Sequence, residues 1–267
     1  MKNSIYITLL GLLIMSSCND YQRALKSEDI AVKFSMGDSL FNAGKYSKAN
    51  RLFEQIVPSY RGKPQAQKLM YMHAMSFFQT KDYYLSGYQF ERFSKAYPQS
   101  EKAEEAAFFS AKSKYMLSPI YTKDQQETRE ALDKLQLFIN DYPDSSYLEE
   151  ANLLVQELDF KLEKKAFEIA KQYNTIYDYR ASIKAFDNFL LEYPGSKLRE
   201  DALYIRLHSA HALSINSVPW KKEERLIDAK AYYEGFKKSF PESDYISEAD
   251  EMIQEINEEL EAYNTKS

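Results

Sequence analysis

Few side chains in this sequence have the types and spacing that catalysis or metal binding needs. His208 and His211 lie three residues apart in "RLHSAH", on a predicted helix, where they could share a metal ion. No third ligand accompanies them at a suitable spacing, which favours a surface or groove role. Adjacent carboxylates such as Glu104 and Glu105 diverge around a helix, and nucleotide-binding loop, serine-hydrolase and HExxH motifs are absent from the sequence. We therefore expect no enzyme, no metal and no cofactor.

The only cysteine lies where a lipid could be attached. Lys2 precedes an apolar run, residues 5–15, that is shorter than the roughly 20 residues a helix needs to span a bilayer. Two serines then precede Cys18, and "MSSCND" resembles the lipobox of bacterial lipoproteins, where the signal is cleaved before the cysteine and that residue is lipidated. The alternative is an unmodified thiol beside a conventional cleavage site. Residues 1–17 are thus expected to be a lipoprotein signal peptide.

Lipidation of Cys18 would place the protein on a membrane without a transmembrane helix. The mature chain would hold no further cysteine, so no intramolecular disulfide could form. Asn19 directly after the cysteine fits, by resemblance to lipoprotein sorting signals, the outer membrane of a Gram-negative cell. The polar residues 18–29 are expected to form a lipidated tether.

Composition indicates a helical globular chain. Of 267 residues, 44% are hydrophobic and only 7 are Gly, and the long stretches rich in Ala, Leu, Glu and Lys show no strand-like alternation. The formal net charge of −5 argues against nucleic acid as the main partner.

One short segment recurs four times as aromatic-Pro-x-Ser, each time with an Ala eight residues after the Pro. The copies are "AYPQSEKAEEA", "DYPDSSYLEEA", "EYPGSKLREDA" and "SFPESDYISEA". Their prolines, at 98, 143, 194 and 241, are 45, 51 and 47 residues apart, as expected for a helical-repeat solenoid. We interpret the Pro as the end of one repeat and the Ser as the cap of the next helix.

The first unit has the frame of a tetratricopeptide repeat, in which Gly37 and Ala49 would let two helices approach closely and Gly44 would make the turn. The predicted fold is all-α, a right-handed superhelical solenoid of about five tetratricopeptide-like helix pairs with a C-terminal capping helix. The third and fifth units would carry loop insertions, "LSPIYTKDQQE" and "INSVPWKKEER". Within a repeat domain of residues 30–267, the approximate units are 30–64, 65–100, 101–145, 146–196 and 197–243, followed by the capping helix 244–262. That last helix is strongly acidic, and an interaction tail is the alternative.

A solenoid of this kind has a concave groove lined by the first helix of each repeat. An aromatic groove suits an extended peptide with bulky apolar anchors. A clamp for a C-terminal carboxylate is not expected, because apolar or acidic residues occupy its positions. The predicted groove residues are Phe34, Asp38, Phe41, Tyr71, Met75, Phe78, Phe108, Lys112 and Tyr115.

Nearly the whole mature length resembles the BamD lipoprotein family of the β-barrel assembly machinery. The lipobox, the tether, about five repeats, the recurring Tyr-Pro-x-Ser and the stretch "YPDSSYLEEANLLVQELDFKLEKKAFEIAKQYNTIYDYRASIKAFDNFLLEYPGS" carry the resemblance. The acidic capping helix is a departure, since it is longer than in the best-known members.

The resemblance implies a scaffold without catalysis at the inner, periplasmic face of the outer membrane. Its N-terminal repeats would receive the C-terminal strand of unfolded outer-membrane proteins, and its C-terminal repeats would dock on the periplasmic domains of BamA. A glycan-capturing tetratricopeptide lipoprotein would need about twice this length. A periplasmic scaffold for cell-wall or cell-division enzymes remains the alternative.

Overall fold

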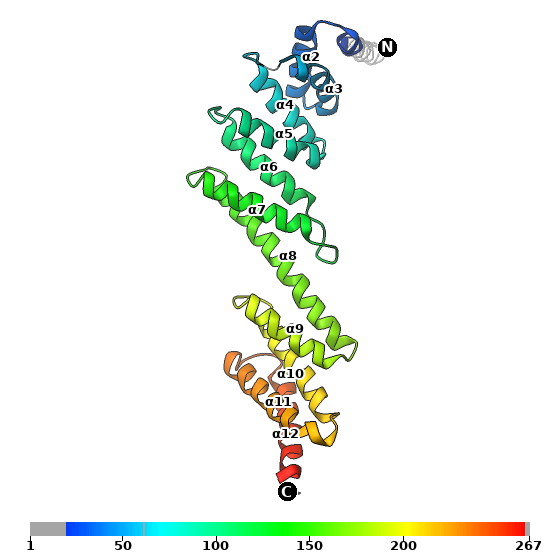
Figure 1. The fold of residues 1–267 in the computed structure, drawn as a ribbon, viewed down its shortest axis with the longest axis vertical. Helices are drawn as coiled ribbons and strands as arrows, with labels where there is room; N and C mark the ends of the chain where they lie inside the picture. The colour runs from blue at the N-terminus through cyan, green and yellow to red at the C-terminus, as the bar shows by residue number, and fades with distance from the viewer. Residues whose placement is uncertain (1–19, 61, 265–267) are drawn as a thin grey trace, which may run out of the picture. The chain divides into compact units, whose positions relative to one another are not determined.

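The computed structural model describes residues 20–60 and 62–264, and all regular structure in these ranges is helical (Figure 1). The all-helical prediction is therefore confirmed for this part of the chain. Residues 1–17 and Cys18 lie outside the described residues, so the signal peptide and the lipid attachment stay predictions. Among the described helices, none is long and apolar enough to cross a membrane.

The chain forms two compact units. Of the described residues, unit 1 comprises those up to Pro119 together with Asp124–Leu158, and unit 2 comprises Ile120–Lys123 and those from Asp159 onward. Helix α8 (Leu148–Thr175) contributes its first part to unit 1 and the rest to unit 2. The other elements of unit 1 are α2 (Ile30–Asn42), α3 (Tyr46–Ile56), the 3-10 helix η1 (Val57–Tyr60), α4 (Ala66–Gln79), α5 (Tyr83–Ala96), α6 (Ala103–Leu117) and α7 (Gln126–Asp141). Unit 2 adds α9 (Tyr179–Glu192), α10 (Arg199–Ile215), α11 (Pro219–Ser239) and α12 (Ile246–Asn264).

Consecutive helices pack as antiparallel pairs, and small residues set how closely they approach. A Cβ added to Gly37 of α2 would lie 2.5 Å from Cε1 of Phe53 on α3, so only Gly fits there. Gly44 has φ +71 in the turn between the same helices, as predicted. The equivalent turn positions, Lys81 and Tyr177, adopt φ 63 without being Gly.

Each aromatic-Pro-x-Ser segment forms the same turn between repeats. The aromatic residue is the C-cap of the second helix of a pair, as Tyr97 is for α5, where its N–H donates to Phe93 O. The serine is not the helix N-cap, so that interpretation is wrong. Ser100 N donates to Tyr97 O, and its hydroxyl accepts from Lys102 N, so the serine closes a tight turn before α6 begins. The same hydroxyl contacts recur at Ser145, Ser196 and Ser243.

Buried serine pairs join neighbouring repeats in both units. Ser113 on α6 donates to Ser86 on α5 at 3.1 Å, and Ser209 on α10 donates to Ser182 on α9 at 2.9 Å. All four side chains are fully buried, and Ser113, Ser182 and Ser209 also donate to backbone carbonyls, so these hydroxyls are satisfied inside the core. The pairs lie at small-residue positions where a second helix of one repeat meets the first helix of the next.

Two boundary predictions are wrong in part. Residues 20–26 of the expected tether form a helix, and Tyr21 and Ala24 are buried in the core of unit 1. The expected insertion "INSVPWKKEER" is mostly helical, because α11 begins at Pro219 and only residues 216–218 separate it from α10. Proline at the first helical position is compatible with a helix start, since its missing N–H has no helical partner there.

Helix α12 packs on α10 and α11 at the end of unit 2 (Figure 1). Ala249 and Ile256 are buried in that core. Its acidic side chains pair with the same unit: Asp250 with Lys237 at 2.9 Å, Glu255 with His211 at 2.8 Å and Glu259 with Lys222 at 2.8 Å. These acids of α12 thus pair within their own unit, and the role of α12 as a capping helix stays a prediction.

Candidate functional site

The structure separates the nine predicted groove residues into core and surface. Phe108 is fully buried and stacks on Tyr147 with ring centroids 4.6 Å apart, and Met75 is 8% exposed in the core around Phe90. These two predictions are wrong, because α6 and α4 are covered on that side by the neighbouring helices of unit 1. The other seven side chains are half-buried.

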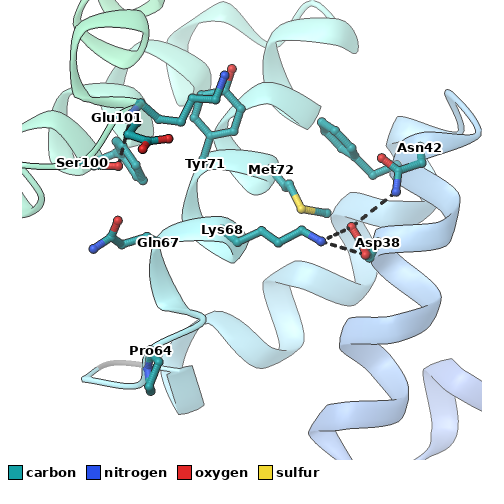
Figure 2. A pocket seen from close by; sticks show the side chains of 12 residues that line it. Asp38, Asn42, Pro64, Gln67, Lys68, Tyr71, Met72, Ser100 and Glu101 are labelled. Atoms are coloured by element: carbon teal, nitrogen blue, oxygen red, sulfur yellow. Dashed lines mark hydrogen bonds and ion pairs between the residues drawn. The ribbon is translucent and has the colours of Figure 1, made fainter.

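Three of the predicted residues come together in one cleft of unit 1, of about 500 Å³, between α2, α4 and the segment that precedes α6. We call it the N-terminal cleft, and Figure 2 shows most of its residues as labelled sticks. The predicted members are Asp38, Phe41 and Tyr71. The complete lining is Asp38, Phe41, Asn42, Pro64, Gln67, Lys68, Tyr71, Met72, Phe93, Ser100, Glu101 and Lys102.

An ion pair crosses the cleft. Lys68 on α4 reaches Asp38 on α2 at 2.8 Å, and the side-chain amide of Asn42 donates to the same carboxylate at 3.5 Å (Figure 2). The Lys68 ammonium also lies 5.7 Å from the ring centroid of Phe34, which stacks on Tyr60. Because the Lys68 side chain is 56% exposed, the pair contributes little to stability and the ammonium can exchange partners.

Tyr71 forms the apolar part of the opposite wall. Its ring packs edge-on against Phe90 and Phe93, with centroids 5.8 and 5.9 Å away. Burial, together with a hydrogen bond to Glu105, raises the pKa of Tyr71 far above its usual range, so the phenol stays neutral. The neutral hydroxyl donates to the Glu105 carboxylate, and the half-buried ring forms part of the cleft wall.

Lys102 lies over the other side of that ring, with its ammonium 5.3 Å from the Tyr71 centroid. It pairs with Glu105 at 2.5 Å, and this hydrogen bond raises the pKa of Lys102. Burial acts to raise the pKa of Glu105, but hydrogen bonds from Lys102 and Tyr71 outweigh it and lower that pKa. The cleft thus holds two lysine ammonium groups beside an aromatic surface, each paired with a carboxylate, and its lining contains the acids Asp38 and Glu101.

Sequence reasoning missed the polar donors of the cleft, among them Asn42, Gln67, Lys68 and Lys102. Lys68 could have been found, because it lies one helical turn before Tyr71 on the same face of α4. Lys102 could not, because it precedes α6 and reaches the cleft only through the turn after α5. Apolar or acidic residues do occupy the expected clamp positions, but lysine and asparagine side chains at other positions line the cleft, so a carboxylate ligand is compatible with it.

The remaining predicted residues are engaged elsewhere in unit 1. Phe78 packs on Phe109, with centroids 4.8 Å apart. Lys112 pairs with Glu150 at 2.6 Å, and the Tyr115 hydroxyl donates to Glu157. None of them belongs to the N-terminal cleft.

The two candidate metal ligands have separate partners. Asn174 donates to Nδ1 of His208 at 3.0 Å, whereas Nε2 of His211 lies 2.8 Å from Glu255. Burial lowers the pKa of His208. In the described part of the chain, no group of three or more His, Cys, Asp or Glu residues could hold a metal ion.

Comparison with known proteins assigns the family. The chain matches the family YfiO, described as outer membrane lipoprotein, over residues 27–218 and 161–266. It belongs to this outer membrane lipoprotein family. The match covers most of both units, including the helices that form the N-terminal cleft.

The similar curated proteins carry one name. A Rickettsia prowazekii protein named outer membrane protein assembly factor BamD is 23% identical over 84% of this chain and 85% of its own length. The Pasteurella multocida protein of the same name is 20% identical over 81% of this chain and 86% of its own length. An Aquifex aeolicus protein provisionally given that name is 26% identical over 93% of this chain and 76% of its own length.

Among solved structures, the chain is similar to a Podosopora anserina protein with TPR-like repeats. The identity is 12%, the match covers 81% of this chain and 98% of that one, and the TM-score is 0.33.

Proposed function

We propose that this protein is a non-catalytic scaffold of the β-barrel assembly machinery, anchored in the outer membrane through lipidated Cys18 and facing the periplasm. Its N-terminal cleft binds C-terminal segments of unfolded outer-membrane proteins, and its C-terminal repeats bind the periplasmic domains of BamA. Membership of the outer membrane lipoprotein family and the names of its relatives support this role.

The N-terminal cleft is the observation that carries the peptide-binding part of the proposal. Phe41 and Tyr71, both half-buried, offer an apolar surface for a bulky side chain at the end of a peptide. Phe93 is fully buried and packs against the Tyr71 ring. Lys68 and Lys102 supply ammonium groups for its terminal carboxylate. In the free protein Asp38 pairs with Lys68. The terminal carboxylate of the bound peptide then replaces Asp38 as the partner of this lysine.

Peptide binding tests this assignment directly. Labelled peptides that match the last residues of an outer-membrane β-barrel protein are titrated against the full mature chain, once as the free acid and once as the C-terminal amide. We expect the free acid to bind more tightly, and Lys68→Met to remove most of that difference. Phe41→Glu should weaken both peptides roughly tenfold or more, because it places a charge on the apolar surface.

The matched control is Tyr84→Glu, because Tyr84 is 71% exposed on α5 and does not line the cleft. If Phe41→Glu and Lys68→Met bind both peptides as the wild type does, the peptide site is not this cleft.

The scaffold role is tested separately by gentle detergent extraction of the native membrane with a tag at the C-terminus, followed by mass spectrometry. A stoichiometric β-barrel partner with periplasmic repeat domains is expected. Recovery of cell-wall or cell-division enzymes without that partner would replace the proposal by the periplasmic scaffold alternative.

A further inference from the structure

Helix α8 carries one apolar stripe that continues from unit 1 into unit 2. Ala151, Leu154 and Leu158 follow one another at three- and four-residue steps and are buried in the core of unit 1. The same core holds residues of α7, namely Ala131, Leu135 and Phe138. Beyond Leu158 the stripe continues at helical spacing as Leu162, Ile169, Tyr173 and Ile176.

The second half of the stripe is open to solvent. Ile169 is 44% exposed, Tyr173 36% and Ile176 60%. The core of unit 2 uses a different face of α8, on which Phe167 and Ala170 pack against Phe186, Phe189 and Ala202. Large apolar side chains are thus exposed on one face of α8, while a different face of the same helix packs in the core of unit 2.

Tyr177 extends this apolar surface at a cost in backbone energy. It follows α8 with φ 63, in the turn position where the first repeat has Gly44, and its side chain is 77% exposed. A non-glycine residue in this conformation costs on the order of 1 kcal/mol. Together, Leu162, Ile169, Tyr173, Ile176 and Tyr177 form what we call the α8 surface.

A basic groove runs along one side of the α8 surface. It has a volume of about 550 Å³ and lies between Tyr121–Thr122 and α8, where Ile169 and Lys171 lie at its two edges and Lys165 lies one turn before Ile169. Lys165 donates to the carbonyl of Lys123, which directs its ammonium toward this groove. The lysines outnumber the one acid of the lining, Glu168, in a chain whose net charge is −5.

We propose that the α8 surface binds an acidic amphipathic α-helix of a partner protein. Its apolar face would cover Ile169, Tyr173 and Ile176, and its acidic flank would face Lys165 and Lys171. The first half of the same stripe already packs against a helix in this way, because α7 contributes to the core in which Ala151, Leu154 and Leu158 are buried. Helix α7 is itself amphipathic and acidic, with four acids, Glu127, Glu130, Asp133 and Asp141, against Arg129 and Lys134.

The length of the surface also fits a helix. Residues 162–176 correspond to about four helical turns, or roughly 21 Å at 1.5 Å per residue. Helix-in-groove recognition uses anchors at this three- and four-residue spacing. This proposal does not rest on peptide binding in the N-terminal cleft, and variants of one surface leave the other unchanged.

Site-specific photo-crosslinking in the native membrane identifies the occupant. A benzoylphenylalanine replaces Tyr173 in the full chain, and crosslinked peptides are mapped by mass spectrometry, with the same group at Tyr84 on α5 as the control. We expect crosslinks from position 173 to an acidic amphipathic helical segment of another protein, and none of these from position 84. Crosslinks to lipid, to a second copy, to unit 1 of the same chain or to β-strand segments would overturn the proposal, as would the absence of any crosslink.

A defined probe tests the chemistry in solution. The probe is a fluorescent peptide with the sequence of α7, Gln126–Asp141, beside a version in which its four acids are amides. We expect Ile169→Asp combined with Ile176→Asp to weaken binding of the acidic peptide roughly tenfold or more. The amide version should bind more weakly than the acidic one, and Lys165→Ala with Lys171→Ala should abolish that preference.

Leu153→Asp is the matched control, since Leu153 is 53% exposed on another face of α8. Thermal unfolding followed by circular dichroism verifies that every variant is folded. Equal affinity of the wild type, the Ile169/Ile176 variant and the control for the acidic peptide would overturn the proposal.

Discussion

Nδ1 of His73 on α4 lies 2.6 Å from Oδ1 of Asn50 on α3, in the buried core of unit 1. The contact joins the second helix of the first repeat to the first helix of the second. His73 also packs edge-on against Phe77, with ring centroids 4.8 Å apart. Burial lowers the pKa of His73 from 6.5 to about 4, so the folded protein holds this imidazole neutral.

The first prediction concerns stability at acidic pH. Between pH 6.5 and about 4, the unfolded chain binds a proton at His73 that the folded chain does not, so the free energy of unfolding falls as pH is lowered through this window. The loss from this one group is about 3 kcal/mol at pH 4, since each pKa unit corresponds to about 1.4 kcal/mol. Urea unfolding at pH 7 and pH 4 measures it.

The control for this prediction is His73→Met with Asn50→Leu, which removes both partners without leaving a buried polar group unsatisfied. Its free energy of unfolding should fall less between pH 7 and pH 4 than that of the wild type. Parallel pH profiles for the two proteins would contradict the role of His73.

A second prediction separates close packing from turn conformation. Gly37→Ala should destabilise unit 1 by about 1–3 kcal/mol, because the new Cβ would overlap the ring of Phe53. Gly44→Ala meets no neighbouring atom within 4 Å and should cost about 1 kcal/mol through its positive φ alone. Adding Phe53→Leu should recover part of the loss in Gly37→Ala and none of the loss in Gly44→Ala. Chemical denaturation of the two single glycine variants and of the two combinations checks this order.

A third prediction concerns the serine pair of unit 1. Ser113→Ala leaves the buried hydroxyl of Ser86 without this partner, and we expect a loss of about 1–3 kcal/mol. Ser86→Ala with Ser113→Ala should cost less than the sum of the single changes, because the two hydroxyls are coupled. Strictly additive free energies of unfolding would mean that the pair contributes nothing as a pair.

A fourth prediction concerns the non-glycine turns. Lys81→Gly should stabilise unit 1 by about 0.5–1 kcal/mol, because relief of the positive φ exceeds the entropy that glycine adds to the unfolded chain. Tyr177→Gly should stabilise unit 2 in the same way while it weakens binding at the α8 surface. A thermal shift in the opposite direction for Lys81→Gly would show that its backbone is not strained.

A fifth prediction tests the membrane anchor. Cys18→Ala removes the only thiol in the sequence and should release the protein from the outer membrane fraction, because the proposed anchor is the lipid attached to that thiol. Fractionation of cells and immunoblotting measure the distribution. A variant that still sediments with the outer membrane would show that another contact holds the protein there.

Periodicity in the sequence was enough to predict the helices and their pairing. The spacing of the four prolines located the repeats, and Gly37, Ala49 and Gly44 identified the close approach and the turn of the first pair. Local signals of this kind act between residues near in sequence, where a helix or a turn fixes the geometry. Pro219 is also a local signal, because proline is common at the first position of a helix. It was not used to predict the start of α11, because it lies in a segment expected to be a loop.

Side-chain exposure was less predictable, because it depends on which neighbours cover a helix face. Phe108 and Phe41 are both aromatic residues on the first helix of a repeat, yet Phe108 lies against Tyr147 and Phe138 in the core whereas Phe41 lines the cleft. The polar residues of the site were equally hard to predict. Lys102 lies over the Tyr71 ring only because the folded turn after α5 brings it to the cleft.

The sequence by itself therefore determined the helical class, the repeat spacing, the place of the turns and the predicted lipid attachment, since these depend on local periodicity and short motifs. Only the tertiary structure decided which aromatic side chains stay open, where Lys68 meets Asp38, and that the stripe of α8 is buried in one unit and exposed in the other. Burial and ion pairing are set by segments distant in sequence, and no pattern within a single helix contains that information.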